Sequence, residues 1–193
     1  MFLRTLAWLA CVAYATIPIF WLVIHPRADF WRLRKHSSYR VLIPLWIAMW
    51  MVVGTITASW RHVALYGTGW GWLPAGFIFV AGLSIYRSSG AGFSAAQLAG
   101  LPEILPGHRE QRLATSGIRA RVRHPVYLGH LCEMLAWSVG TGLVVCYGLT
   151  IFAVVTGAVM IRLEEKELEQ RFGKEYRDYQ RRVPAVVPRI RAR

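Results

Sequence analysis

Two groups of residues in the second half of the chain have the types and spacing that a chemical site needs. The first is the segment 123–129, Arg-His-Pro-Val-Tyr-Leu-Gly, which joins a guanidinium, an imidazole and a phenol. The second begins with Glu164 and Glu165 and continues with Leu168, Phe172, Gly173, Tyr176, Tyr179, Val183 and Pro184. Residues 130–163 between them are apolar and almost uncharged. If this stretch crosses a membrane and returns, both groups meet on one face, and the sequence predicts a site at the mouth of a helical hairpin.

Each group alone fits an ordinary structural role. His124 followed by Pro125 is typical of a helix start, because proline is tolerated at the first helical position. An acidic pair directly after an apolar run, as at Glu164 and Glu165, is typical of a solvated helix start. Together they form a long pattern, Arg-His-Pro-x-Tyr-x-Gly, a gap of two spans, then Glu-Glu-x-x-Leu-x-x-x-Phe-Gly-x-x-Tyr-x-x-Tyr. Chance does not readily produce a pattern of this length, so we interpret the two groups as one site.

Glu133 is a further candidate, because this acid lies well inside an apolar stretch. An unpaired carboxylate in a bilayer is energetically costly, and such residues are functional candidates by default. His130 precedes it by three residues and lies on the same face of a helix. The alternative is that His130 and Glu133 satisfy each other as a packing pair between helices.

The composition indicates that a membrane-spanning bundle positions these residues. Hydrophobic residues make up 55% of the chain and charged residues 17%, and the apolar residues gather in long runs. A helix crosses the bilayer core with about 20 residues. We predict an all-α integral membrane protein, a single domain over residues 1–193, with about five transmembrane helices and a cytoplasmic C-terminal helix. The predicted spans are 5–25, 41–59, 70–86, 126–143 and 147–163.

The tail after the last span is predicted to be helical. Its large apolar and aromatic residues recur at helical spacing and form one stripe, Leu168, Phe172, Tyr176 and Tyr179. Pro184 ends this helix. The turn between the last two spans is predicted near 140–148, where glycines gather.

The distribution of charge predicts the orientation in the membrane. The net charge is +13, which in a soluble protein would suggest nucleic acid. Here the basic residues lie between apolar runs, so contact with anionic lipid explains them better, and we expect no nucleic-acid partner. Loops 26–40 and 87–125 and the tail are strongly positive, whereas loop 60–69 and the turn near 140–148 are not. This pattern predicts an outside N-terminus and a cytoplasmic C-terminus, in a bacterial inner membrane.

The three cysteines, Cys11, Cys132 and Cys146, all lie inside apolar runs. Their spacing matches neither a metal site nor a disulfide framework. We therefore predict that they are reduced packing residues and that the chain holds no metal.

At the residues of the split motif, the chain resembles the isoprenylcysteine carboxyl methyltransferase family. This is a group of integral-membrane enzymes that use S-adenosylmethionine and are related to the phospholipid N-methyltransferases. The resemblance covers about residues 113–189, the region that would bind the cofactor. Family members usually have Gly, then Pro or Ile, then Tyr ahead of the motif, whereas here Gly117 and Ile118 are followed by Arg119. Either an aromatic cofactor contact is missing, or Arg119 serves a different substrate.

The resemblance implies a set of cofactor-binding residues. They are His124, Pro125, Tyr127, Gly129, Glu164 and Glu165. The two glutamates would accept hydrogen bonds from the ammonium and the ribose hydroxyls of the cofactor, and S-adenosylhomocysteine would be the product. Carboxylates suit this role chemically, because they are acceptor-only groups.

The predicted reaction is methyl transfer to a lipophilic acceptor at the cytoplasmic face of the membrane. An apolar, water-poor site suits displacement at a sulfonium, and the acceptor can enter sideways between helices. A carboxylate acceptor needs a cation such as Arg123 to hold it. An amine acceptor needs a base, for which Glu133 or His130 is placed. The acceptor stays open between a prenylated cysteine, a phospholipid, a quinone-like molecule and a small hydrophobic xenobiotic, and so does the oligomeric state.

Two other classes of function are compatible with parts of the sequence. Membrane steroid and sterol reductases, which use NADPH, have an Asn-Tyr-x-Gly-Glu-x-x-Glu pattern that residues 127–133 resemble, with Glu133 at the last acid. Against this alternative, Pro125 and Val126 replace the asparagine context, and His130 replaces the first acid. The chain is also short for that family. The third class is a non-catalytic membrane protein with a degenerate pocket, against which the intact motif argues.

Cysteine labelling tests the predicted topology. In a cysteine-free background, cysteines introduced at Ser37 and Ser116 should react with a membrane-impermeant maleimide from the cytoplasmic side, because both lie in basic loops. A cysteine at Thr68 should react from the opposite side. Labelling of position 68 from the cytoplasm would contradict the five-span arrangement.

Overall fold

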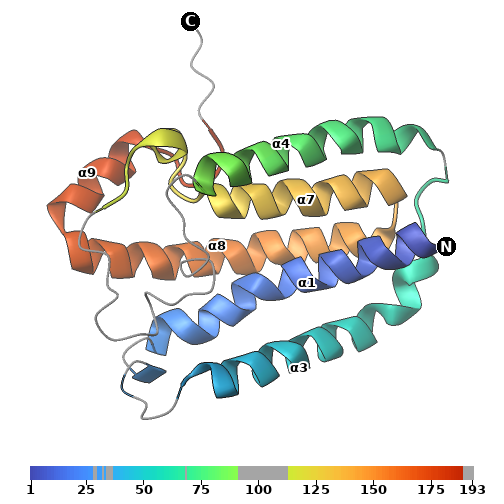
Figure 1. The fold of residues 1–193 in the computed structure, drawn as a ribbon, viewed down its shortest axis with the longest axis horizontal. Helices are drawn as coiled ribbons and strands as arrows, with labels where there is room; N and C mark the ends of the chain where they lie inside the picture. Colours follow the sequence, from blue (N-terminus) through green and yellow to red (C-terminus); the bar gives the residue numbers. More distant parts are fainter. Residues whose placement is uncertain (28–29, 32, 34–36, 68, 91–112, 189–193) are drawn as a thin grey trace, which may run out of the picture.

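The computed structural model describes residues 1–27, 30–31, 33, 37–67, 69–90 and 113–188, and these form a bundle of helices (Figure 1). The elements in chain order are α1 (Phe2–Ile24), η1 (His25–Arg27), α3 (Tyr39–Thr57), η2 (Ala58–His62), η3 (Gly69–Gly71), α4 (Trp72–Gly90), η4 (Gly117–Ala120), α7 (Pro125–Thr141), α8 (Val144–Phe172) and α9 (Lys174–Arg182), where η marks short 3-10 helices. Within these residues no strand forms beyond one isolated bridge between Ala64 and Leu143. The all-α prediction is confirmed.

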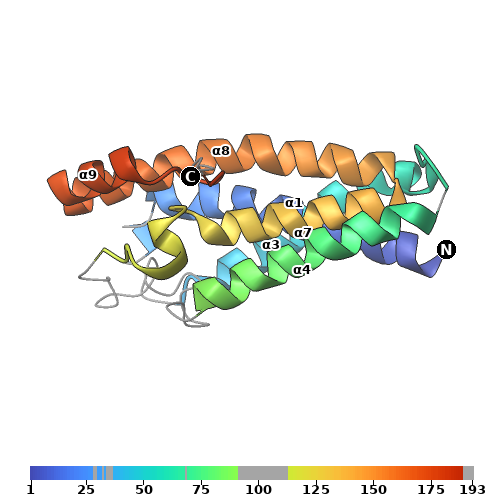
Figure 2. The same ribbon diagram turned by 90° about the horizontal axis from the view of Figure 1, so that it is seen from above.

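Four of the long helices have the length and hydropathy that crossing a membrane requires. They are Phe2–Arg27, Tyr39–His62, Gly69–Ser89 and Val144–Phe172. The chain is therefore an integral membrane protein. The predicted span 126–143 corresponds to α7, which has 17 residues and falls short of the about 20 that cross a bilayer core. In the view from above, α7 lies between α4 and α8, so neighbouring helices cover much of it (Figure 2).

The connections divide between the two ends of the bundle in the way that the basic loops predict (Figure 1). The N-terminus, η2, η3 and the turn between α7 and α8 lie at one end. The end of α1, η4 and α9 lie at the other. Position 68, most of the predicted loop 87–125, part of loop 26–40 and the last residues of the tail lie outside the described residues.

The C-terminal helix differs from the prediction. One continuous helix, α8, runs from Val144 through the acidic pair to Phe172, so the predicted span 147–163 is only its apolar part. The chain then breaks at Gly173, whose φ of 55° is one that other residues rarely adopt. The stripe predicted on one helix is therefore divided between α8 and α9. Its members still pack together in one buried cluster, Leu168, Phe172, Tyr176 and Tyr179 with Leu113 and Val183.

Helices α4 and α7 pack closely, and the side chain of Glu133 on α7 is directed at α4. A Cβ added at Gly82 would stand 2.7 Å from Oε1 of Glu133, and one added at Gly129 would stand 2.9 Å from the ring of Tyr86. Gly82 and Tyr86 are about one turn apart on α4, as are Gly129 and Glu133 on α7. The two contacts are thus successive layers of one antiparallel interface, in which each glycine makes room for a large side chain of the other helix.

Candidate functional site

The two halves of the motif meet at one end of the bundle, where the imidazole of His124 lies between two carboxylates. His124 directly precedes Pro125, the first residue of α7, and α8 continues past its apolar part to carry both glutamates. Nε2 of His124 lies 3.1 Å from Oε1 of Glu165, and Nδ1 lies 3.4 Å from Oε2 of Glu164. Only 6% of His124 is exposed. The fold therefore joins residues that are far apart in the sequence.

The two carboxylates determine the charge of His124. Burial by itself lowers the pKa of a histidine, because it disfavours the charged form. Glu164 and Glu165 outweigh burial and raise the pKa of His124 from 6.5 to about 9. His124 is therefore an imidazolium at neutral pH and can donate from both ring nitrogens.

The guanidinium of Arg123 is fully engaged within the protein. Its Nε donates to Oε1 of Glu165 at 2.8 Å, and a terminal nitrogen donates to the same oxygen. The other terminal nitrogen donates to the backbone carbonyls of Gln180, at 3.1 Å, and Val183. Arg123 was expected to hold a carboxylate acceptor. In the structure it joins α8 to Gln180 of α9 and to Val183, which follows α9, and a role toward an acceptor stays a prediction.

A C-terminal strap, residues 183–188, lies across the start of α7. The backbone N–H groups of Arg123 and His124 donate to the carbonyls of Pro184 and Ala185, at 2.9 and 2.8 Å. The bond from His124, the N-cap residue of α7, satisfies an N–H group that has no partner inside the helix. The strap is thus fixed to the charged cluster by its backbone, and its side chains are free to form a wall of the neighbouring space.

The two glutamates have different surroundings. Glu165 accepts from Arg123 and contacts His124 through Oε1, and it accepts from Nε2 of Gln180 through Oε2 at 3.3 Å. Oε2 of Glu164 is buried, and no described residue gives it a well-aligned hydrogen bond, although His124 lies within ion-pair distance. The hydroxyl of Tyr176 is likewise buried and unpartnered among the described residues. Glu164 therefore keeps acceptor capacity that Glu165 has already used.

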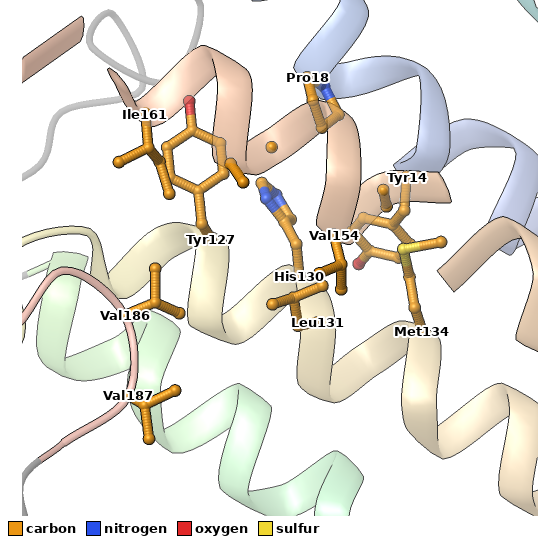
Figure 3. A pocket seen from close by; sticks show the side chains of 13 residues that line it. Tyr14, Pro18, Tyr127, His130, Leu131, Met134, Val154, Ile161, Val186 and Val187 are labelled. Carbon is orange, nitrogen blue, oxygen red and sulfur yellow. The ribbon is translucent and has the colours of Figure 1, made fainter. Parts of the chain in front are cut away.

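An apolar cavity of about 210 Å³ lies beside this cluster (Figure 3). It is lined by Tyr14 and Pro18 of α1, by Tyr127, His130, Leu131 and Met134 of α7, by Ala153, Val154, Gly157, Ala158 and Ile161 of α8, and by Val186 and Val187 of the strap. Figure 3 shows the imidazole of His130 projecting between the side chains of Tyr127 and Tyr14. Tyr127 lines the cavity, and its ring centroid is 6.0 Å from that of His124, so Tyr127 borders both the cavity and the charged cluster.

His130 and Glu133 do not form the packing pair that was one expectation from the sequence. Nδ1 of His130 and Oε1 of Glu133 are both buried, and neither has a hydrogen-bond partner in the described part of the chain. His130 lines the cavity, whereas Glu133 is directed at Gly82 of α4 and is not among the lining residues. Of the two predicted bases, only His130 is therefore placed where it can touch a molecule in the cavity.

The other predicted site residues have structural surroundings as well. Pro125 is buried and begins α7, and the hydroxyl of Tyr127 donates to the sulfur of Met160 at 3.2 Å. Gly129 packs against the ring of Tyr86, so its assignment to a cofactor pocket stays a prediction.

Sequence patterns did not reveal Gln180 or Tyr14 as parts of this region, because both reach it only through tertiary packing. Val183 and Pro184 of the strap belong to the predicted motif, but its spacing did not reveal the backbone bonds that they make to the start of α7. Arg119, which replaces an expected aromatic residue, accepts a hydrogen bond from the hydroxyl of Tyr179 at its carbonyl, at 2.6 Å.

Curated proteins with methyltransferase names are similar to this chain. It is 42% identical over 82 residues to protein-S-isoprenylcysteine O-methyltransferase B from Arabidopsis thaliana, a match that covers 40% of this chain and 40% of that protein. It is 28% identical over 155 residues to methanethiol S-methyltransferase 2 from Bradyrhizobium diazoefficiens, which covers 78% of this chain and 53% of that protein.

The chain is also similar to a protein with a reductase name, a delta(14)-sterol reductase from Mus musculus. The two are 36% identical over 98 residues, a match that covers 48% of this chain and 23% of that protein. The chain thus spans about half the length, or less, of the curated relatives it matches. No family model matches the chain, and no solved structure matches it significantly.

The raised pKa of His124 predicts how stability depends on pH. Because the folded pKa exceeds the unfolded one, the stabilisation is fully present below pH 6.5 and is lost as pH rises through about 9. A rise from 6.5 to about 9 corresponds to about 3 kcal/mol. Unfolding in mixed detergent micelles should therefore show a difference between the wild type and His124→Gln that is largest below pH 6.5 and shrinks toward pH 9.

His62→Gln, in η2, controls for the loss of a histidine elsewhere. A difference between the wild type and His124→Gln that stays constant, or grows, between pH 6.5 and 9 would contradict the charged state assigned to His124.

Proposed function

We propose that this chain, whose curated relatives support an isoprenylcysteine carboxyl methyltransferase-like family, is an integral-membrane methyltransferase that acts on a lipophilic acceptor with S-adenosylmethionine as methyl donor. The observation that carries the proposal is the buried cluster in which His124 lies between Glu164 and Glu165. This cluster borders an apolar cavity between α1, α7 and α8. A polar cofactor and an apolar acceptor can therefore meet at one boundary.

The residues of the cluster fit such a cofactor. S-adenosylmethionine carries ammonium and hydroxyl donors, and a carboxylate can only accept. Glu164 offers a buried oxygen that no described residue supplies with a hydrogen bond. Glu165 is engaged by Arg123, His124 and Gln180. We therefore assign Glu164 to the donors of the cofactor and Glu165 to holding the cluster together.

S-adenosylmethionine, when bound, supplies an electrophilic methyl group. The chain itself supplies position and a water-poor surrounding, which suit displacement at a sulfonium because the positive charge disperses as the bond breaks. Val186 and Val187 of the strap and Ile161 of α8 form apolar walls next to the cluster. Arg123 acts here as a positioning residue, and His130 is the residue placed to take a proton from an acceptor.

The distribution of basic loops supports a proposed orientation in the membrane. We place the charged cluster on the cytoplasmic side of a bacterial inner membrane, with the N-terminus outside. On that side a water-soluble cofactor would approach the cluster from the cytoplasm, whereas the cavity lies among the helices, where a lipophilic acceptor would arrive from the membrane.

An NADPH-dependent reductase of the sterol reductase type is the second candidate. The similarity to the delta(14)-sterol reductase and the buried acid Glu133 favour it. Glu133, however, faces α4 and does not line the cavity. The methyltransferase therefore remains the function that the site supports better.

Calorimetry of the detergent-solubilised protein tests the proposed function. S-adenosylhomocysteine should bind at micromolar strength, and NADPH should not bind. Glu164→Gln should weaken S-adenosylhomocysteine about ten- to hundred-fold, because a hydrogen bond to a charged group contributes about 1.5–3 kcal/mol. Glu169→Gln is the matched control: the same helix carries it, outside the cluster, where it pairs with Arg177. Tight NADPH binding without S-adenosylhomocysteine binding would reverse the order of the two candidates.

A further inference from the structure

The charged cluster contains one acceptor and one donor that no described residue engages. The acceptor is Oε2 of Glu164, and the donor is the hydroxyl of Tyr176. Both atoms are buried, and a buried polar atom without a hydrogen bond costs free energy. Such atoms are rare in folded proteins, and two of them beside one site point to a ligand that brings its own donor and acceptor.

Tyr176 reaches the cluster from α9. Only 1% of this residue is exposed, and its ring packs against that of Tyr179. Its charged neighbours include Glu165 and Arg123. Gln180, about one turn further along the helix, donates to Glu165. This face of α9 is therefore directed at the cluster, although the spacing of the sequence predicted Tyr176 only as a packing residue.

The hydroxyl of Tyr176 keeps a proton to donate. Burial, and next the charge of Glu165, raise the pKa of Tyr176 above its ordinary value of about 10, so the phenol stays protonated. Arg123 cannot take up this proton, because a guanidinium has donors only. Its nitrogens already donate to Glu165 and to backbone carbonyls. The donor capacity of Tyr176 is thus available to a ligand.

The charges of the cluster limit which ligand fits. Arg123 and the imidazolium of His124 supply two positive charges, and Glu164 and Glu165 supply two negative ones. These charges cancel, so a ligand group with a single charge would leave a net charge in a buried place, which is costly. A zwitterion adds no net charge. Its ammonium needs an acceptor and its carboxylate needs a donor, which are the two capacities that the cluster has to offer.

We propose that Glu164 and Tyr176 form a zwitterion site for the amino-acid end of the cofactor. The hydroxyl of Tyr176 donates to the carboxylate of the ligand, and Glu164 accepts from its ammonium. The inference rests on the proposed methyltransferase function and adds Tyr176 to its cofactor-binding residues. Each contact involves an ionised group, and such hydrogen bonds are about twice as strong as neutral ones.

Two truncated ligands separate the two contacts on the wild-type protein. One is decarboxylated S-adenosylhomocysteine, which keeps the ammonium. The other is deaminated S-adenosylhomocysteine, which keeps the carboxylate. In calorimetry of the detergent-solubilised full chain, each should bind at least about tenfold more weakly than S-adenosylhomocysteine, because each leaves one contact unmade. Equal affinities for S-adenosylhomocysteine and the decarboxylated compound would overturn the role of Tyr176 without any variant.

Two variants assign each contact to its residue. Tyr176→Phe should weaken S-adenosylhomocysteine and the deaminated compound about ten- to hundred-fold, and it should change the affinity for the decarboxylated compound less than about twofold. Glu164→Gln should weaken the decarboxylated compound by a similar factor, and it should not weaken the deaminated one. Binding of the ligand that is not weakened shows that each variant is folded.

Tyr179→Phe is the matched control on the same helix. Its ring lies 6.0 Å from that of Tyr176, and its hydroxyl donates to the carbonyl of Arg119 at 2.6 Å. This variant should unfold more readily in mixed detergent micelles and keep the ratio of the three affinities. Tyr176→Phe removes a hydroxyl without a partner, so the ligand-free variant should be as stable as the wild type or more stable. A marked loss of stability in Tyr176→Phe would contradict an available donor.

The outcomes separate the inference from the proposed function. If S-adenosylhomocysteine binds the wild type, but Tyr176→Phe weakens all three ligands alike or none of them, the inference is wrong and the methyltransferase proposal stands. If none of the three ligands binds the wild type, the proposed function itself fails, and the inference fails with it.

Discussion

The pairing of Arg123 with Glu165 is the interaction on which the rest of the site depends. Both side chains are mostly shielded from water, with 10% and 16% exposed. Removing one partner of such a buried pair leaves the other charge uncompensated, which typically costs about 3–5 kcal/mol. Through this pair and the carbonyl of Val183, Arg123 fixes the start of α7 to α8 and to the strap. Without it, His124 would be held by its contacts with the two glutamates, and the strap by two backbone hydrogen bonds to the start of α7.

This constraint also separates charge from apolar space. All the ionised groups of the motif face one another at the end of the bundle, where His124 is held between Glu164 and Glu165. The described residues that line the neighbouring cavity are mostly aromatic and aliphatic, and they include the imidazole of His130. A polar cofactor on one side and an apolar acceptor on the other is the division of binding that this arrangement supports.

The sequence predicted the helices better than it predicted the contacts between their side chains. Long apolar runs predict the helices, because hydropathy is a local property of the sequence. The gap of two spans between the motif halves predicts that they meet, because two crossings return the chain to the same side. The break at Gly173 was missed, since the stripe of large residues keeps helical spacing across it. The engagement of Arg123 by the strap, and the turn of Glu133 toward Gly82 rather than His130, depend on tertiary packing that no spacing reveals.

A structure of the protein with S-adenosylhomocysteine bound tests the central claim most directly. The account predicts ligand density that contacts Glu164 and the strap and borders Tyr127, with Arg123 still paired with Glu165. Density at another end of the bundle, or Arg123 released from Glu165 to bind the ligand, would contradict it.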